Sequence, residues 1–131
     1  MLAVYAEALL AIGQEPKAKT PTINRVVHVL PDGADKQRAL AFFAKGLFAS
    51  YDAWGHQNIT GLSTEARTLE QTDTEHLIVG EEAFCIDAIE RYRALGIKEI
   101  ACLMNFGGPE LDAVERSMRL FGEKVMPRLN G

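Results

Sequence analysis

The sequence predicts an α/β fold in which parallel strands are flanked by helices. Segments of strand length alternate with segments of helix length, and the strand segments are rich in apolar and β-branched residues. One of these strands ends in a Gly-Gly-Pro turn that leads directly into a helix. Alternating strands and helices favour a parallel sheet with right-handed crossovers. We therefore expect a single domain over residues 1–131.

The composition is that of a globular protein with one modest core. The chain has 131 residues, of which 47% are hydrophobic and 24% charged, and its net charge of −4 argues against a nucleic-acid partner. No apolar run approaches the roughly 20 residues that a membrane span needs. The first residues lack the basic region of a signal peptide and include Glu7. A cytoplasmic protein without membrane or nucleic-acid partners is expected.

The first element is predicted to be a helix over residues 1–13. Leu2, Tyr5 and Leu9 recur at helical spacing, and Gly13 is suited to end the helix. The polar connector that follows, residues 14–22, contains two prolines, which disfavour a helix.

A strand and a long helix are predicted next. Residues 23–30 form a β-branched run of strand length, and Pro31-Asp32-Gly33 closes it as a turn. Residues 34–54 present apolar side chains on one helical face. Gly46 in the middle of this helix is expected to weaken it by about 1 kcal/mol relative to alanine.

A polar segment and a short strand lead into the last third. Residues 55–75 are polar and carry little periodicity, so we interpret them as a flap or insertion. Residues 76–80 form a short extended segment.

The last third is predicted to be a helix, a strand, a glycine-rich turn and a helix. The first helix covers 82–95 and stops at Gly96. The strand at 97–104 is almost continuously apolar, which is typical of a parallel strand buried on both faces. It ends at Asn105-Phe106-Gly107-Gly108-Pro109, and the final helix runs from about 109 to 125. Two or three such strands make a poor sheet alone, so we expect this sheet to require further strands.

This last third resembles the C-terminal end of luciferase-like flavin-dependent monooxygenases. The family pattern combines a short IVG strand, a GI-x-x-x-ACLMNFGG strand region and a helix with RSM-x-LF and VMP. The matching residues are Ile78 to Gly80, Leu95 to Ile97, Ala101 to Gly108, Arg116 to Met118, Leu120, Phe121 and Val125 to Pro127. Upstream, residues 25–30 (RVVHVL) resemble the penultimate barrel strand of the family.

The resemblance implies the C-terminal part of a (β/α)8 TIM-type barrel. Such a barrel has eight strands, so about five or six would be missing here, together with most of the flavin phosphate site. One departure concerns Glu81 and Glu82, which stand where the family has Ser or Thr followed by Pro. Acidic side chains at a helix start argue against an anion site there.

Two places in the sequence are candidates for chemistry. Asn105, Phe106, Gly107 and Gly108 follow a strand at its carboxyl end, where barrel enzymes bind ligands. They are the candidate cofactor-binding residues, although the glycines could equally serve only to shape a tight turn. His28 is the candidate catalytic residue, as a proton donor or substrate contact, and its alternative role is that of a hydrogen-bonded core histidine.

No metal site is expected. Cys85 and Cys102 do not have ligand spacing, and neither His56 nor His76 has a carboxylate or cysteine suitably placed. Trp54 is expected to pack against the adjacent helix, with contact to a flavin or an apolar substrate as the alternative.

Three functional hypotheses follow. If the chain is part of a luciferase-like enzyme, reduced FMN, or a related flavin or deazaflavin, reacts with dioxygen and oxygenates a small organic substrate in the complete barrel. The isolated chain should then bind flavin weakly or not at all. A second hypothesis is a non-catalytic assembly module that pairs through sheet edges, either as a homo-oligomer or with a separate N-terminal subunit. A third is a small three-layer α/β binding protein unrelated to the barrel.

Overall fold

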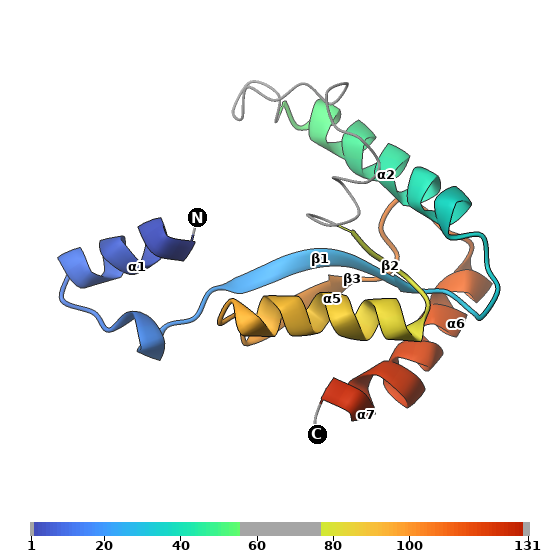
Figure 1. Cartoon of the computed structure of the whole chain (residues 1–131). Helices are drawn as coiled ribbons and strands as arrows, with labels where there is room; N and C mark the ends of the chain where they lie inside the picture. The colour runs from blue at the N-terminus through green and yellow to red at the C-terminus, as the bar shows by residue number, and fades with distance from the viewer. Residues whose placement is uncertain (1, 56–76, 130–131) are drawn as a thin grey trace.

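The computed structural model describes residues 2–55 and 77–129, and its core is a three-stranded parallel sheet (Figure 1). The strands are β1 (Thr22–Val29), β2 (Leu77–Gly80) and β3 (Glu99–Leu103), arranged in the order β2-β1-β3. Val26 of β1 lies opposite Leu77 of β2 and Leu103 of β3. The predicted α/β class with parallel strands and flanking helices is therefore confirmed.

Helices cover the two faces of the sheet. On one face, α2 (Lys36–Ala53) packs Leu40, Phe43 and Leu47 against side chains of β1 and β2. On the other face, α5 (Glu82–Ala94), α6 (Leu111–Leu120) and the π-helical turn η3 (Phe121–Val125) cover the sheet. Successive strand residues point to opposite faces, so β1 supplies both cores. The result is a three-layer arrangement.

This strand order differs from the order that a (β/α)8 barrel implies. In such a barrel each strand pairs with its neighbours in the chain and all helices lie on the outside. Here the chain crosses from β2 over β1 to reach β3, which pairs with the opposite edge of β1. When the chain reverses the direction in which it adds strands to the sheet and keeps right-handed crossovers, consecutive crossover helices lie on opposite faces. The order 2-1-3 is that of doubly wound sheets.

The helix ends follow their local chemistry. Gly96 adopts a φ of 88°, and the N–H of Ile97 bonds the carbonyl of Tyr92, so α5 ends in a Schellman motif as Gly96 predicts. Helix α6 continues through η3 into α7 (Met126–Leu129), beyond the predicted end. The widened turn precedes Pro127, whose ring would otherwise meet the carbonyl of Glu123 in a regular helix.

The prediction that residues 97–104 are buried on both faces is wrong. In β3 the exposure alternates, with Ala101 exposed and Leu103 38% exposed. The reason is that β3 is an edge strand whose α5-side residues, including Cys102, are covered, while α2 does not extend over its other face. Expected burial of Trp54 is also wrong, because its side chain is 62% exposed.

The N-terminal helix stands apart from the layered body. Figure 1 shows α1 (Leu2–Ala11) beside the amino end of β1, joined to it through the short 3-10 helix η1 (Pro16–Ala18). Gly13 ends α1 with a φ of 73°, as predicted. Only Leu9 of this helix is buried. The predicted flap at 55–75, apart from Gly55, lies outside the described residues, as do His56 and His76.

Candidate functional site

The strands end together at one edge of the sheet. After β1 the chain turns into α2 on one face, whereas after β3 it turns into α6 on the other face. In open α/β sheets, the place where neighbouring strands lead to opposite faces leaves a crevice that serves as the usual ligand site. Sheet topology alone thus points to the carboxyl ends of β1 and β3.

A cleft of about 620 Å³ lies at this position. Its floor includes His28, Val29 and Leu30 from the end of β1. One wall comes from the start of α2 and the other from the start of α6, including Pro109 and Ala113. Most lining side chains are apolar, and the few polar ones besides His28 are charged. A mainly apolar lining with a few polar groups is typical of small-molecule sites.

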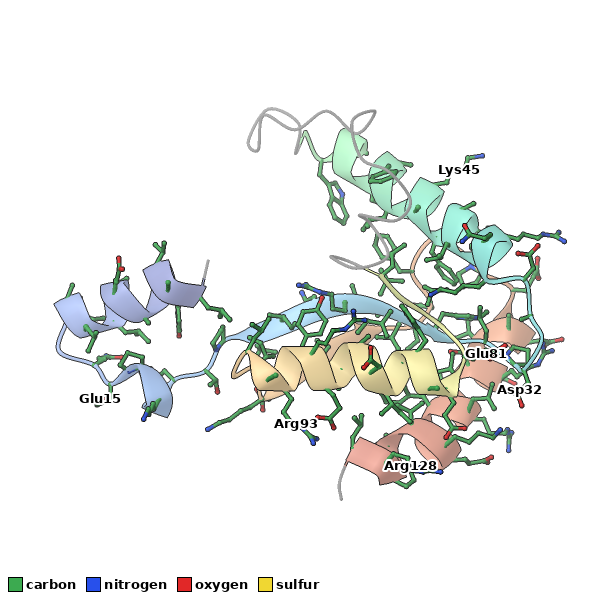
Figure 2. All side chains as sticks on the ribbon, in the orientation of Figure 1. Glu15, Asp32, Lys45, Glu81, Arg93 and Arg128 are labelled. Carbon is green, nitrogen blue, oxygen red and sulfur yellow. The ribbon has the colours of Figure 1, made fainter. Side chains whose placement is uncertain are left out.

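The α2 wall is held in place by two turn contacts. Gly33 has a φ of 77°, and its N–H donates to Glu81 Oε1 at 3.0 Å, which ties the turn after β1 to the end of β2. Figure 2 shows Glu81 and Asp32 at this same end of the molecule. Asp35 then caps α2, since its Oδ1 accepts from the N–H of Arg38 at 3.0 Å.

The α6 wall is attached to the sheet by a buried serine. The N–H of Val29 donates to Ser117 Oγ at 2.8 Å. The next N–H along the chain, that of Leu30, donates to the carbonyl of Gly80 on the β2 side, so the Val29 N–H points to the β3 side. There β3 pairs only as far as Leu103 opposite Val26. Ser117, which is fully buried, therefore satisfies a donor that the sheet leaves without a partner.

His28 lies at the floor of the cleft and is 6% exposed. Its ring contacts that of Phe43, with 4.8 Å between centroids. Burial lowers the pKa of His28 below its usual 6.5, and a hydrogen bond to the backbone of Met104 partly opposes this shift. Its buried Nδ1 has no hydrogen-bond partner.

Two arginines flank the apolar part of the cleft. Arg38 comes from the first turn of α2 and Arg116 from the second turn of α6, and both are exposed. Neither forms an ion pair with another residue in the described parts of the chain. The acidic residues of the cleft are Asp35, already bonded to α2, and Glu110 at the start of α6, which makes no capping bond.

The structure places the other sequence-predicted site residues beside the cleft rather than in its lining. Asn105 is exposed, and Phe106 packs against the α2 core. Gly107, with a φ of 83°, lies so close to α2 that a Cβ on Gly46 would stand 2.9 Å from its Cα. Gly108 also has a positive φ of 72°. These glycines shape the turn, and ligand binding by residues 105–108 stays a prediction.

Sequence reasoning did not single out Arg38 and Arg116. Arg116 lies in the RSM motif, but nothing in the sequence places that motif opposite the start of α2. The two arginines share a cleft because β3 pairs with β1, which is a long-range property of the sheet.

Among the described residues, no group of three or more His, Cys, Asp or Glu side chains could hold a metal ion. In that same part of the chain, no helix is both long and apolar enough to cross a membrane.

The fold is similar to that of a solved monooxygenase. Superposition on monooxygenase RslO1 from Streptomyces bottropensis gives a TM-score of 0.65 at 19% sequence identity, over 98% of this chain and 36% of RslO1. The chain therefore spans little more than a third of that protein's length. At this identity the likeness establishes a shared fold. No family model and no curated protein matches the sequence.

Proposed function

We propose that this chain is the C-terminal segment of a luciferase-like flavin-dependent monooxygenase, with the cleft as its contribution to the organic-substrate site. The observation that carries the proposal is the structural match to a monooxygenase over 98% of the chain. The resemblance of residues 77–129 to the family supports it. Oxygenation of an organic substrate is then the activity of the complete protein.

The described residues fit only part of a flavin. The cleft offers the aromatic side chains of Phe42 and Phe43 and two guanidinium groups. However, the Gly107-Gly108 turn, which would bring backbone N–H groups to a phosphate, packs against Gly46 and does not line the cleft. We therefore assign no catalytic step to the cofactor, whether FMN or a deazaflavin. In the proposal, the cofactor is held by residues outside this chain, and this segment binds and shields the substrate.

If this chain is part of a complete barrel, strand β3 must also change the strand with which it pairs. A (β/α)8 barrel would place β3 next to β2, whereas β3 pairs with β1 in this structure. The proposal therefore implies that β3 changes partner when the remaining strands are present. A cysteine cross-link from β1 to Cys102 of β3 tests this implication directly.

The test is a flavin titration of two preparations, the purified 131-residue chain and the native assembly isolated through a tag on this chain. The proposal expects saturable binding of FMN or a deazaflavin by the assembly. It expects binding by the chain alone to be on the order of millimolar or weaker, because few contacts are available to offset the entropy of association. Micromolar stoichiometric binding by the chain alone would contradict the division of the site. An assembly that binds neither flavin would contradict the proposed function.

A second candidate is an assembly module, and one observation favours it. The outer edge of β3 has no strand partner within the described sheet, and its Leu103 is exposed. Open edges offer backbone donors and acceptors to a second chain. Pairing of two β3 edges around a two-fold axis would give a homodimer. Light scattering that finds a monodisperse monomer, with no binding of an apolar dye, would rule this candidate out.

A further inference from the structure

Three features of the cleft limit what it can bind. Its walls are largely apolar and include Phe42, whose side chain is 45% exposed in spite of its size. Arg38 and Arg116 each offer a guanidinium group that is not used in an ion pair within the described residues. The floor contains His28, whose Nδ1 has almost no accessible surface and is therefore out of reach of a ligand in the cleft.

The first two features each correspond to one chemical group on a ligand. Guanidinium groups match the planar, bidentate geometry of a carboxylate. An exposed aromatic wall favours an apolar body such as an aromatic ring.

We infer that the cleft binds an aromatic carboxylic acid, with its carboxylate at Arg38 and Arg116 and its ring along Phe42. The inference rests on the proposed function in taking the cleft as the substrate site, and it adds the substrate class. The acidic side chains do not cancel the two arginines. Asp35 is held by the backbone of α2, and Glu110 is exposed to solvent.

Both walls add a favourable field for the carboxylate. The cleft lies at the starts of α2 and α6, which have 18 and 10 residues. The positive ends of their macrodipoles therefore face the same space. Glu110 acts against this field, so its replacement by glutamine is expected to tighten binding of an acid about threefold or less.

The experiment is an NMR and calorimetric titration of the full chain with benzoate and its methyl ester. We expect saturable binding of benzoate. The ester, which lacks the charge, should bind roughly tenfold more weakly. Arg116→Gln and Arg38→Gln should each weaken acid binding by a similar factor and leave ester binding unchanged. Arg119→Gln, on the same helix as Arg116 but outside the cleft lining, should have no effect.

Equal binding of acid and ester would overturn the carboxylate assignment. The titrations contain no flavin. A flavin-free native assembly would thus contradict the monooxygenase proposal without affecting these results, and failure of benzoate to bind would leave flavin binding untouched.

Discussion

At the scale of single residues, His28 couples the cleft to the stability of the fold. Burial lowers its pKa below 6.5, so the unfolded chain takes up a proton at a pH where the folded chain does not. Its contribution to stability is complete above pH 6.5 and is lost as the pH falls through the range between 6.5 and the lower folded-state value.

The resulting prediction concerns His28→Gln, which removes the titrating group. Between about pH 7.5 and about pH 5, the urea midpoint of the wild type should fall more steeply than that of the variant. Carboxylates contribute equally to the pH dependence of the urea midpoint in both proteins. The difference between the two slopes is therefore due to His28. Parallel curves over this range would contradict the buried, neutral state of the ring.

Gly46 acts through a backbone contact rather than through helix propensity. From the sequence, a glycine inside helix 34–54 is only a weak point that alanine should improve by about 1 kcal/mol. In the structure, the added Cβ would lie 2.9 Å from the Cα of Gly107. Neither the added Cβ nor the backbone of Gly107 can rotate away from this contact. The contact must therefore push α2 away from the turn after β3.

We therefore expect Gly46→Ala to destabilise the protein by about 1–3 kcal/mol, despite the better helix former. The matched control is Gly122→Ala, since Gly122 has a negative φ and no atom within 4 Å of an added Cβ. This control should be neutral or stabilising by up to about 1 kcal/mol. Denaturant unfolding of both variants measures the difference. A Gly46→Ala protein as stable as the control would show that the turn does not pack as described.

At the scale of elements, Ser117 is the main polar link between α6 and the sheet. Ser117→Ala leaves the N–H of Val29 buried without an acceptor, at a cost of about 1–3 kcal/mol. Ser50→Ala is the control, because within the described residues Ser50 Oγ only donates back to the carbonyl of Gly46 in its own helix. Its loss should cost less than about 0.5 kcal/mol. Thermal unfolding that ranks the two variants the other way would argue against this attachment.

Strand order can be tested with the natural cysteine of β3. Arg25 of β1 lies opposite Cys102, and parallel neighbours stand about 4.8 Å apart, within the range that a disulfide spans. Arg25→Cys should therefore form a disulfide with Cys102 on mild oxidation. Asn24→Cys should not, because Asn24 pairs with Ala101 and faces the other side of the sheet. Mass spectrometry under non-reducing conditions distinguishes them.

The same variant tests the barrel proposal. In the isolated chain the disulfide is expected, whereas in the native assembly a barrel with β3 beside β2 would prevent it. A disulfide that forms equally in both would mean that β3 keeps its place beside β1 throughout. The luciferase-like barrel would then be contradicted, while the fold described for the isolated chain would stand.

Local elements could be predicted from the sequence because their signals are local. Gly13 and Gly96 end helices where predicted, and the β-branched run after Ile23 forms β1. The burial of β3 could not be predicted in this way. An apolar composition predicts two covered faces, but the actual cover depends on which edge of β1 the strand joins.

The candidate site was only partly predictable for the same reason. The sequence predicts His28 as a candidate site residue from its position within an apolar strand. The structure places it at the floor of the cleft, and its catalytic role stays a prediction. The arginines were not identified, because Arg38 and Arg116 are far apart in the sequence and meet only through the pairing of β1 with β3. Residues 105–108 carry the family pattern, yet their visible role is to pack a turn against α2.

At the scale of the whole molecule, α1 is the element least explained by the isolated chain. Val4, Leu10 and Ile12 are 68%, 58% and 69% exposed, although this segment is almost entirely apolar. Such a helix is marginal in water without packing, because ten residues are too few for stability by propensity alone. Its exposed side chains are therefore expected to drive self-association through this end of the molecule.

The prediction uses the triple variant Val4→Lys, Leu10→Lys and Ile12→Lys. It should shift the chain toward monomer and reduce binding of an apolar dye, because exposed side chains lose their contacts between copies while the layered core is untouched. The urea midpoint of the core should change little, since surface substitutions cost less than about 0.5 kcal/mol each. Leu111→Lys is the control, as Leu111 is 69% exposed on α6, at the other end of the sheet. If the control lowers association as much as the triple variant, general surface hydrophobicity rather than α1 drives it, and α1 loses its role in assembly.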